Sequence, residues 1–108
     1  MGLFFWKDNK KIDAFARAMA DDLYSHVQPD IARDFLNGQA FKSKKKQQKV
    51  KQRFTGIINQ MKQFRDANEL GVYGKARMQM TFNKRLQELG YSVEDTNQLV
   101  EMILTRLG

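Results

Sequence analysis

The chain contains no cysteine, and it has one proline and one histidine among its 108 residues. Without cysteine, neither a disulfide framework nor a thiolate zinc site can form. The single histidine, His26, gives no Ser-His-acid triad in its sequence context, and no pair of carboxylates lies in an apolar setting that would raise a pKa. We therefore expect a protein that is not an enzyme and that uses neither a cofactor nor a metal.

Long apolar runs are also missing, because no stretch approaches the roughly 20 residues that cross a bilayer. The apolar residues 1–6, MGLFFW, are too few for the core of a signal peptide, and Trp6 stands where the myristoylation pattern requires Ser or Thr. We expect an unprocessed cytoplasmic protein.

Acidic residues are absent from the middle of the chain, between Asp34 and Asp66. Within this gap, residues 42–53 form what we call the basic segment. The other 12 of the 19 Lys and Arg are balanced by 12 Asp and Glu, so the net charge of +7 is a local feature. The cations of the basic segment are Lys42, Lys44, Lys45, Lys46, Lys49, Lys51 and Arg53.

The scarcity of proline and the long helical periodicity predict an all-α domain. We expect an antiparallel bundle of four to five helices, formed by residues 9–108 and preceded by an apolar arm, residues 1–8. One long central helix has a basic N-terminal half. The predicted helices cover about residues 10–27, 29–37, 42–70, 75–89 and 93–107.

Capping and turn residues set these predicted ends. Asp8 or Asn9 is expected to cap the first helix, because their side chains accept bonds from free backbone N–H groups. Gly71 and Gly74 are expected to break the chain before the fourth helix. Ser92 begins a capping pattern for the last helix, with an acid three residues later.

Apolar spacing predicts which faces are buried. The long helix carries a seam at steps of four and three residues, which ends at Val50 and is typical of a bundle core: Val50, Phe54, Ile57, Met61 and Phe64. The last helix is expected to face inward through Leu99, Val100, Ile103, Leu104 and Leu107. Because the first part of the basic segment has nothing to bury, we expect residues 39–48 to be flexible until a polyanion binds. A homodimer through the seam stays open.

A cluster of cations without acids attracts polyanions, and nucleic acid, DNA or RNA, is the partner we expect first. The lysines of the basic segment and Arg53 would contact phosphates, and Gln47, Gln48, Gln52 and Arg53 would reach base edges if the helix lay in a major groove. The alternative without a partner is a solvated charged face that aids solubility.

The apolar arm points to a second class of partner. Trp and Phe favour the membrane interface, and nearby lysines favour anionic lipid. Together with the basic segment, the arm would anchor the protein peripherally at the inner face of a membrane, or dock it on a protein as a scaffold. The alternative without a partner is that the arm folds back and fills the bundle core. The candidate contact residues are Leu3, Phe4, Phe5 and Trp6.

His26 and Asp22 are four residues apart, so they share one face of the first helix. A metal site would need more ligands than this pair supplies. We interpret the two residues as a surface pair near a helix C-terminus, where a histidine cation is favourable.

Overall fold

The computed structural model describes residues 2–37 and 44–107, and it describes side chains over residues 9–37 and 44–106. The regular secondary structure of the described residues is all helix, which confirms the predicted all-α class with five helices packed together. These helices are α1 (Gly2–His26), α2 (Pro29–Leu36), α3 (Lys44–Ala67), α4 (Val72–Glu88) and α5 (Val93–Leu107).

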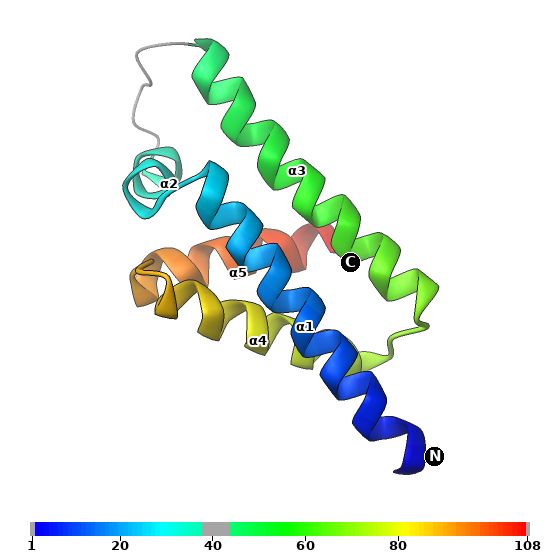
Figure 1. Ribbon diagram of the computed structural model, residues 1–108. Helices are drawn as coiled ribbons and strands as arrows, with labels where there is room; N and C mark the ends of the chain where they lie inside the picture. Colours follow the sequence, from blue (N-terminus) through cyan, green and yellow to red (C-terminus); the bar gives the residue numbers. More distant parts are fainter. Residues whose placement is uncertain (1, 38–43, 108) are drawn as a thin grey trace.

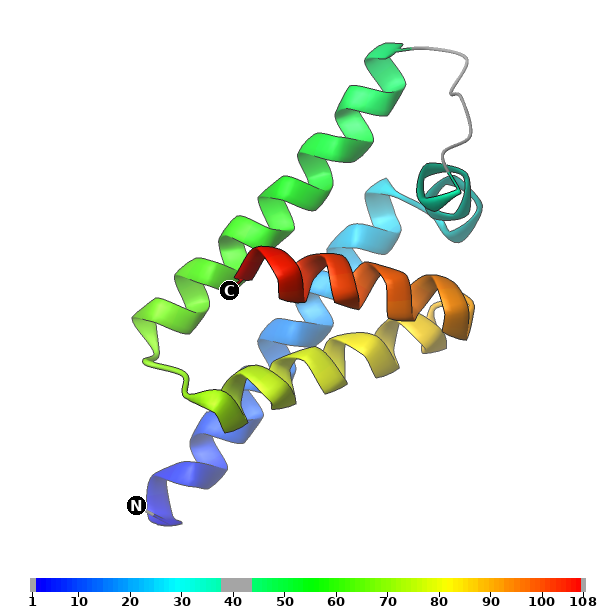
Figure 2. The ribbon, with the colours of Figure 1, turned by 180° about the vertical axis from the view of Figure 1, so that it is seen from behind.

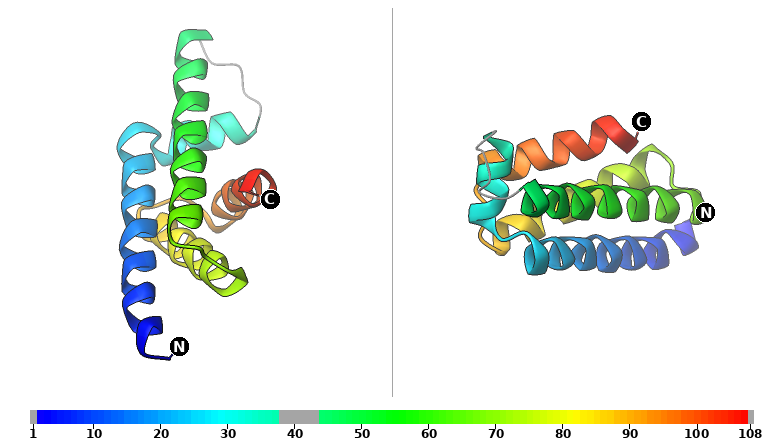
Figure 3. Two further views of the ribbon diagram at one scale, coloured as in Figure 1. Left: turned by 90° about the vertical axis from the view of Figure 1, so that its right-hand side faces the viewer. Right: turned by 90° about the horizontal axis from the view of Figure 1, so that it is seen from above.

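Two long helices form the frame of the molecule. α1 has 25 residues and α3 has 24, so α3 is not the only long element. The two run side by side in opposite directions, and the hairpin of α4 and α5 crosses them (Figures 1 and 3). The short helix α2 lies at one end, between α1 and α3 in the chain, as the reverse view also shows (Figure 2). The first turns of α3 extend past the end of α1.

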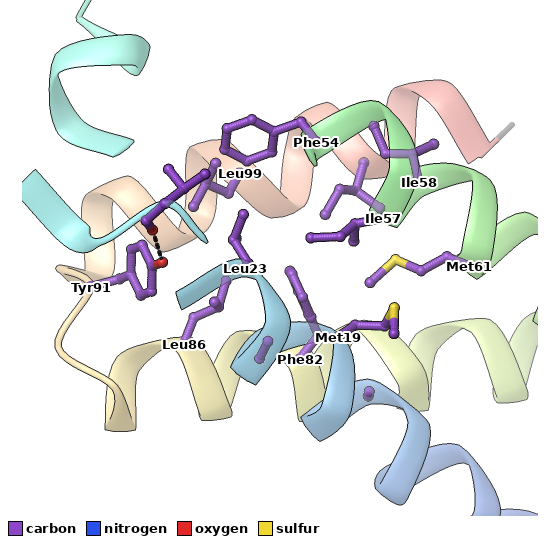
Figure 4. Close-up of a cluster of buried hydrophobic side chains, with 14 of the residues drawn as sticks. Met19, Leu23, Phe54, Ile57, Ile58, Met61, Phe82, Leu86, Tyr91 and Leu99 are labelled. Atoms are coloured by element: carbon purple, nitrogen blue, oxygen red, sulfur yellow. Dashed lines mark hydrogen bonds between the residues drawn. The ribbon is translucent and has the colours of Figure 1, made fainter. Parts of the chain in front are cut away.

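The core lies where these helices meet (Figure 4). The predicted seam of α3 is buried at Val50, Phe54, Ile57 and Met61, and Phe64 packs against the core with partial exposure. α1 contributes Leu23 and α4 contributes Phe82, both fully covered. Other core members are Ile12, Ala16, Met19, Val27, Ile58, Met78, Leu86 and Leu99.

The predicted start of the first helix was wrong. α1 begins at Gly2 rather than near Lys10, so the arm is helical in its backbone and neither Asp8 nor Asn9 is an N-cap. No proline or glycine lies between Gly2 and the end of α1 at His26, and extending an existing helix costs little compared with starting one. The side chains of residues 2–8 lie outside the described residues.

The break between α3 and α4 also differs from the prediction. α3 ends at Ala67, and Glu69, with φ of 50°, makes the reversal that we expected from glycine. α4 begins at Val72, so Gly74 lies inside its first turn. A Cβ at Gly74 would lie 3.0 Å from a side-chain carbon of Leu70, so this glycine permits close packing rather than a break.

For α5, the predicted start is confirmed, Leu99 and Ile103 are buried and Val100 is partly buried, while the side chain of Leu107 lies outside the described residues. The helix begins at Val93, and the backbone N–H of Asp95 donates to Ser92 Oγ over 3.0 Å, as the capping pattern requires. Leu104 is an exception, since it is 45% exposed. It lies one residue past the buried Ile103, and only one side of α5 packs on the other helices, so the expected inward position of Leu104 was wrong.

Polar contacts between distant parts of the chain fix the helices against one another. Arg77 of α4 donates to both carboxylate oxygens of Asp13, at 3.0 and 2.8 Å, and Thr81 donates to the same carboxylate at 2.9 Å. The hydrogen bond from Arg77 is the largest influence on Asp13 and lowers the pKa of that carboxyl. α1 and α4 are thereby joined by charge as well as by apolar packing.

The turn after α1 is fixed by Tyr91, which lies between α4 and α5. Its hydroxyl donates to the backbone carbonyl of Val27, the contact that is dashed in Figure 4. The ring is 3% exposed, and burial raises the pKa of the Tyr91 hydroxyl. Tyr24 meets it edge-on, with ring centroids 6.4 Å apart. Two turns of the chain are therefore held together at one point.

Candidate nucleic-acid interface

The structure places the described part of the basic segment in the first half of α3, the green helix of Figure 1. Within residues 44–53, Val50 alone is buried. Every cation there is exposed: Lys44, Lys45, Lys46, Lys49, Lys51 and Arg53. Residues 39–43, which include Lys42, lie outside the described residues. Residues 44–48 are helical. The predicted flexibility of residues 39–48 therefore stays a prediction.

The first turn of α3 is electrostatically unfavourable in the free protein. It contains no acid, and its lysines lie at the positive end of the helix dipole. Lys45 and Lys49 are four residues apart, where two like charges oppose helix formation by a few tenths of a kcal/mol. An anion near this end would relieve both effects.

Four arginines outside the basic segment are paired with acids, three of them with acids on other helices. Arg77 bonds Asp13 and Arg85 bonds Asp21, each with a shortest N–O distance of 2.8 Å. Arg33 of α2 approaches Asp95 of α5 at 3.4 Å. Within the described chain, by contrast, Lys44, Lys45, Lys49, Lys51 and Arg53 form no ion pair. The basic segment thus keeps its positive charge available.

Two hollows flank the basic segment on different sides of α3. The inner hollow, about 560 Å³, lies where α1, α2 and α3 meet, and it is lined by His26, Ile31, Lys46, Lys49, Val50, Gln52 and Arg53. The outer hollow, about 500 Å³, lies wholly on α3, and it is lined by Gln48, Lys51, Gln52, Thr55, Gly56 and Asn59. The first is cationic over an apolar floor, and the second is rich in amide groups.

The outer hollow contains the two glutamines Gln48 and Gln52, which we expected to reach base edges. Gly56 lines it as well, and the space beside this glycine is open, since a Cβ built there would meet nothing within 4 Å. A glycine in the interior of a helix costs about 1 kcal/mol relative to alanine. The fold gives no packing reason for Gly56. A glycine within the apolar seam pattern of a helix was the signal for this hollow that sequence reasoning missed.

His26 was predicted to pair with Asp22, and the structure confirms this pair at 3.5 Å. The ring Nδ1 lies 2.9 Å from the backbone oxygen of Asp22. Because a carbonyl oxygen can only accept, the proton of the ring lies on Nδ1 in this arrangement. Nε2 is then left for another partner. Sequence reasoning did not connect His26 with the basic segment, because only the tertiary fold brings them to one hollow.

The described residues contain neither a metal-binding group nor a membrane-spanning helix. In the described ranges, no group of three or more His, Cys, Asp or Glu side chains could hold a metal ion. No helix between residues 2 and 37 or between 44 and 107 combines the length and the apolar content that crossing a bilayer requires. For the candidate contacts at Leu3, Phe4, Phe5 and Trp6, the structure describes only the helical backbone.

Comparison with known proteins gave no match to a family model, to a curated protein or to a solved structure.

Proposed function

We propose that this chain is a non-enzymatic nucleic-acid-binding protein, an antiparallel helical bundle that presents α3 as its central, basic binding element. The observation that carries the proposal is the concentration of exposed cations in a stretch without acids. Residues 44–53 carry six exposed cations, and no acid occurs in the sequence between Asp34 and Asp66. Exposed charge of one sign on one helix is the electrostatic footprint of a phosphate-binding surface.

The shape of α3 supports the same proposal. Its first turns extend past the end of α1, so a large partner can approach them from several sides (Figure 3). A projecting helix of this kind fits the width of the major groove of duplex DNA. The lysines would contact the phosphates along the groove walls, and Gln48, Gln52 and Asn59 lie on the amide-rich face that would turn toward base edges.

A titration with labelled duplex DNA, duplex RNA and anionic liposomes at two salt concentrations tests the proposal. The matched pair of variants removes four cations each. One changes Lys44, Lys45, Lys46 and Lys49 to Gln, and the control changes Arg17, Lys62, Lys84 and Arg106 to Gln. We expect salt-sensitive binding of nucleic acid that the first variant loses and the control largely keeps. Absence of nucleic-acid binding at low salt, or equal loss in both variants, would refute the proposal.

The alternative function is a peripheral membrane or scaffolding module that uses residues 2–6 together with the basic segment. One observation favours keeping it: α1 is helical from Gly2, and its first turns lie past the point where α4 crosses it (Figure 1). Trp6 and the two phenylalanines before it would then lie on a helix, as in interfacial anchors. Liposome binding that survives high salt and disappears when residues 2–6 are deleted would support this alternative. The proposal also includes a cytoplasmic location, which cell fractionation tests. It leaves a homodimer possible, and light scattering would measure the mass of the particle in solution.

A further inference from the structure

The inner hollow brings together four side chains that can carry positive charge. Lys46, Lys49 and Arg53 come from α3, and His26 comes from the last turn of α1. The three α3 residues recur at spacings of three and four, so they lie on the face of α3 that looks toward α1 and α2. No carboxylate is among the lining residues. The floor is apolar, with Val50 only 4% exposed.

The walls of the inner hollow are held in place by contacts outside it. Phe35 of α2 stacks on Phe54 of α3, with ring centroids 5.2 Å apart. Arg33 of α2 also reaches Asp95 of α5. The chain between α1 and α2 is fixed by the bond from the Tyr91 hydroxyl to the Val27 carbonyl. A site with such fixed walls loses little freedom when a ligand enters.

Charge and shape together indicate which ligand fits. A phosphodiester inside a nucleic-acid strand carries one negative charge, whereas a terminal phosphomonoester carries about −1.5 to −2 at neutral pH. Three permanent cations and the His26 imidazolium, whose Nε2–H donates when the ring is protonated, match the larger charge better. A hollow also admits the end of a strand more readily than the convex side of a continuous duplex. Arg53 can hold two phosphate oxygens at once, and the lysines act as point charges.

We propose that the inner hollow binds the terminal phosphate of a nucleic-acid strand, through Lys46, Lys49, Arg53 and His26. This inference rests on the proposed function, since it assigns one end of the bound nucleic acid to a defined place on the protein. The exposed lysines on the other sides of α3 then contact the phosphates that follow. The protein would discriminate strands by whether their ends are phosphorylated.

Oligonucleotides of one sequence, carrying a 5′-phosphate, a 3′-phosphate or hydroxyl groups at both ends, test this inference by fluorescence anisotropy. Each also carries the dye at an internal base. We expect one phosphorylated form to bind about tenfold more tightly than the hydroxyl form, which is the effect of one additional charge-assisted hydrogen bond. The variant Lys49→Gln/Arg53→Gln should lose this preference. The control Lys44→Gln/Lys51→Gln removes the same charge away from the inner hollow, so it should bind all oligonucleotides more weakly and keep the preference.

Equal affinity of the wild type for phosphorylated and hydroxyl ends would overturn the inference while leaving the proposed function intact. If no oligonucleotide binds, the proposed function fails, and a second measurement decides the inference. Inorganic phosphate is titrated while the methyl signals of Ile31 and Val50 are followed by NMR. Saturating shifts in the wild type that are absent in Lys49→Gln/Arg53→Gln would establish a phosphate site whose ligand is not nucleic acid. Unchanged signals would overturn the site itself.

Discussion

Replacement of Gly56 by alanine is expected to stabilise the free protein and to weaken its binding of nucleic acid. Gly56 lies in the interior of α3, where glycine lowers the free energy of unfolding by about 0.5–1 kcal/mol relative to alanine. A Cβ there would meet no atom within 4 Å, so the added methyl causes no clash that would cancel this gain. For a domain of this size, we expect the melting temperature to rise by about 3–6 °C.

The effect on binding has the opposite sign because the same methyl fills the outer hollow. If the amide-rich face of α3 contacts nucleic acid, the duplex must approach the helix most closely at Gly56, beside Gln52 and Asn59. The added methyl would hold the duplex away from α3 and lengthen the hydrogen bonds from the neighbouring amide side chains to the nucleic acid. Thermal unfolding followed by circular dichroism gives the first quantity, and anisotropy with labelled duplex gives the second.

Gln63→Ala is the matched control, since Gln63 is exposed on the same helix and does not line the outer hollow. It should change stability and binding little. An unchanged or lower melting temperature for Gly56→Ala would refute the view that the fold does not require this glycine. A higher melting temperature with unchanged binding would show that the ligand does not approach α3 at the outer hollow.

Three further predictions concern the contacts that hold the helices together. Tyr91→Phe should lower the free energy of unfolding by about 1–2 kcal/mol in urea denaturation, because the buried Val27 carbonyl loses its donor; equal stability would mean that the bond contributes nothing. Asp13→Asn should cost about 1–2 kcal/mol at pH 7, since it breaks the bond to the Arg77 guanidinium. The pKa of Asp13 is lowered in the folded state, so the carboxylate stabilises the fold above the unfolded value of 3.8. This stabilisation is lost as the pH falls through the folded value. A difference in unfolding free energy between wild type and variant that persists undiminished at pH 2 would contradict this. Thr96→Val should raise stability by about 1 kcal/mol, because Thr96 is fully buried and its hydroxyl has no hydrogen-bond partner in the described chain; a lower melting temperature would contradict that reasoning.

Local chemistry explains why some of the fold could be predicted from the sequence. Pro29 marks the start of α2 and Ser92 the cap before α5, because each acts on backbone groups within a few residues. The α3 seam was predictable because the spacing of its apolar residues is itself a consequence of helix geometry. The start of α1 was not predictable, because Asp and Asn occur inside helices as well as at helix ends. The tertiary fold, rather than the local sequence, decides which of these positions Asp8 and Asn9 take.

Contacts between distant residues explain most of what the sequence could not predict. Asp13 and Arg77, like Tyr91 and Val27, are 64 residues apart, and nothing in the spacing of either pair indicates the bond. One part of the candidate site could also be predicted from the sequence, and another part could not. The cations of the basic segment were evident as a run, whereas the place of His26 in the inner hollow depends on how α1 ends beside α3.

The most direct test of the central claim is the salt dependence of duplex binding. The logarithm of the association constant is measured against the logarithm of the salt concentration for the wild type and for the variant with Lys44, Lys45, Lys46 and Lys49 changed to Gln. Each phosphate contact contributes a slope of about −0.9, so removing four contacts should make the slope shallower by about 3 to 4. Parallel lines for the two proteins would contradict the claim that α3 holds the nucleic-acid backbone.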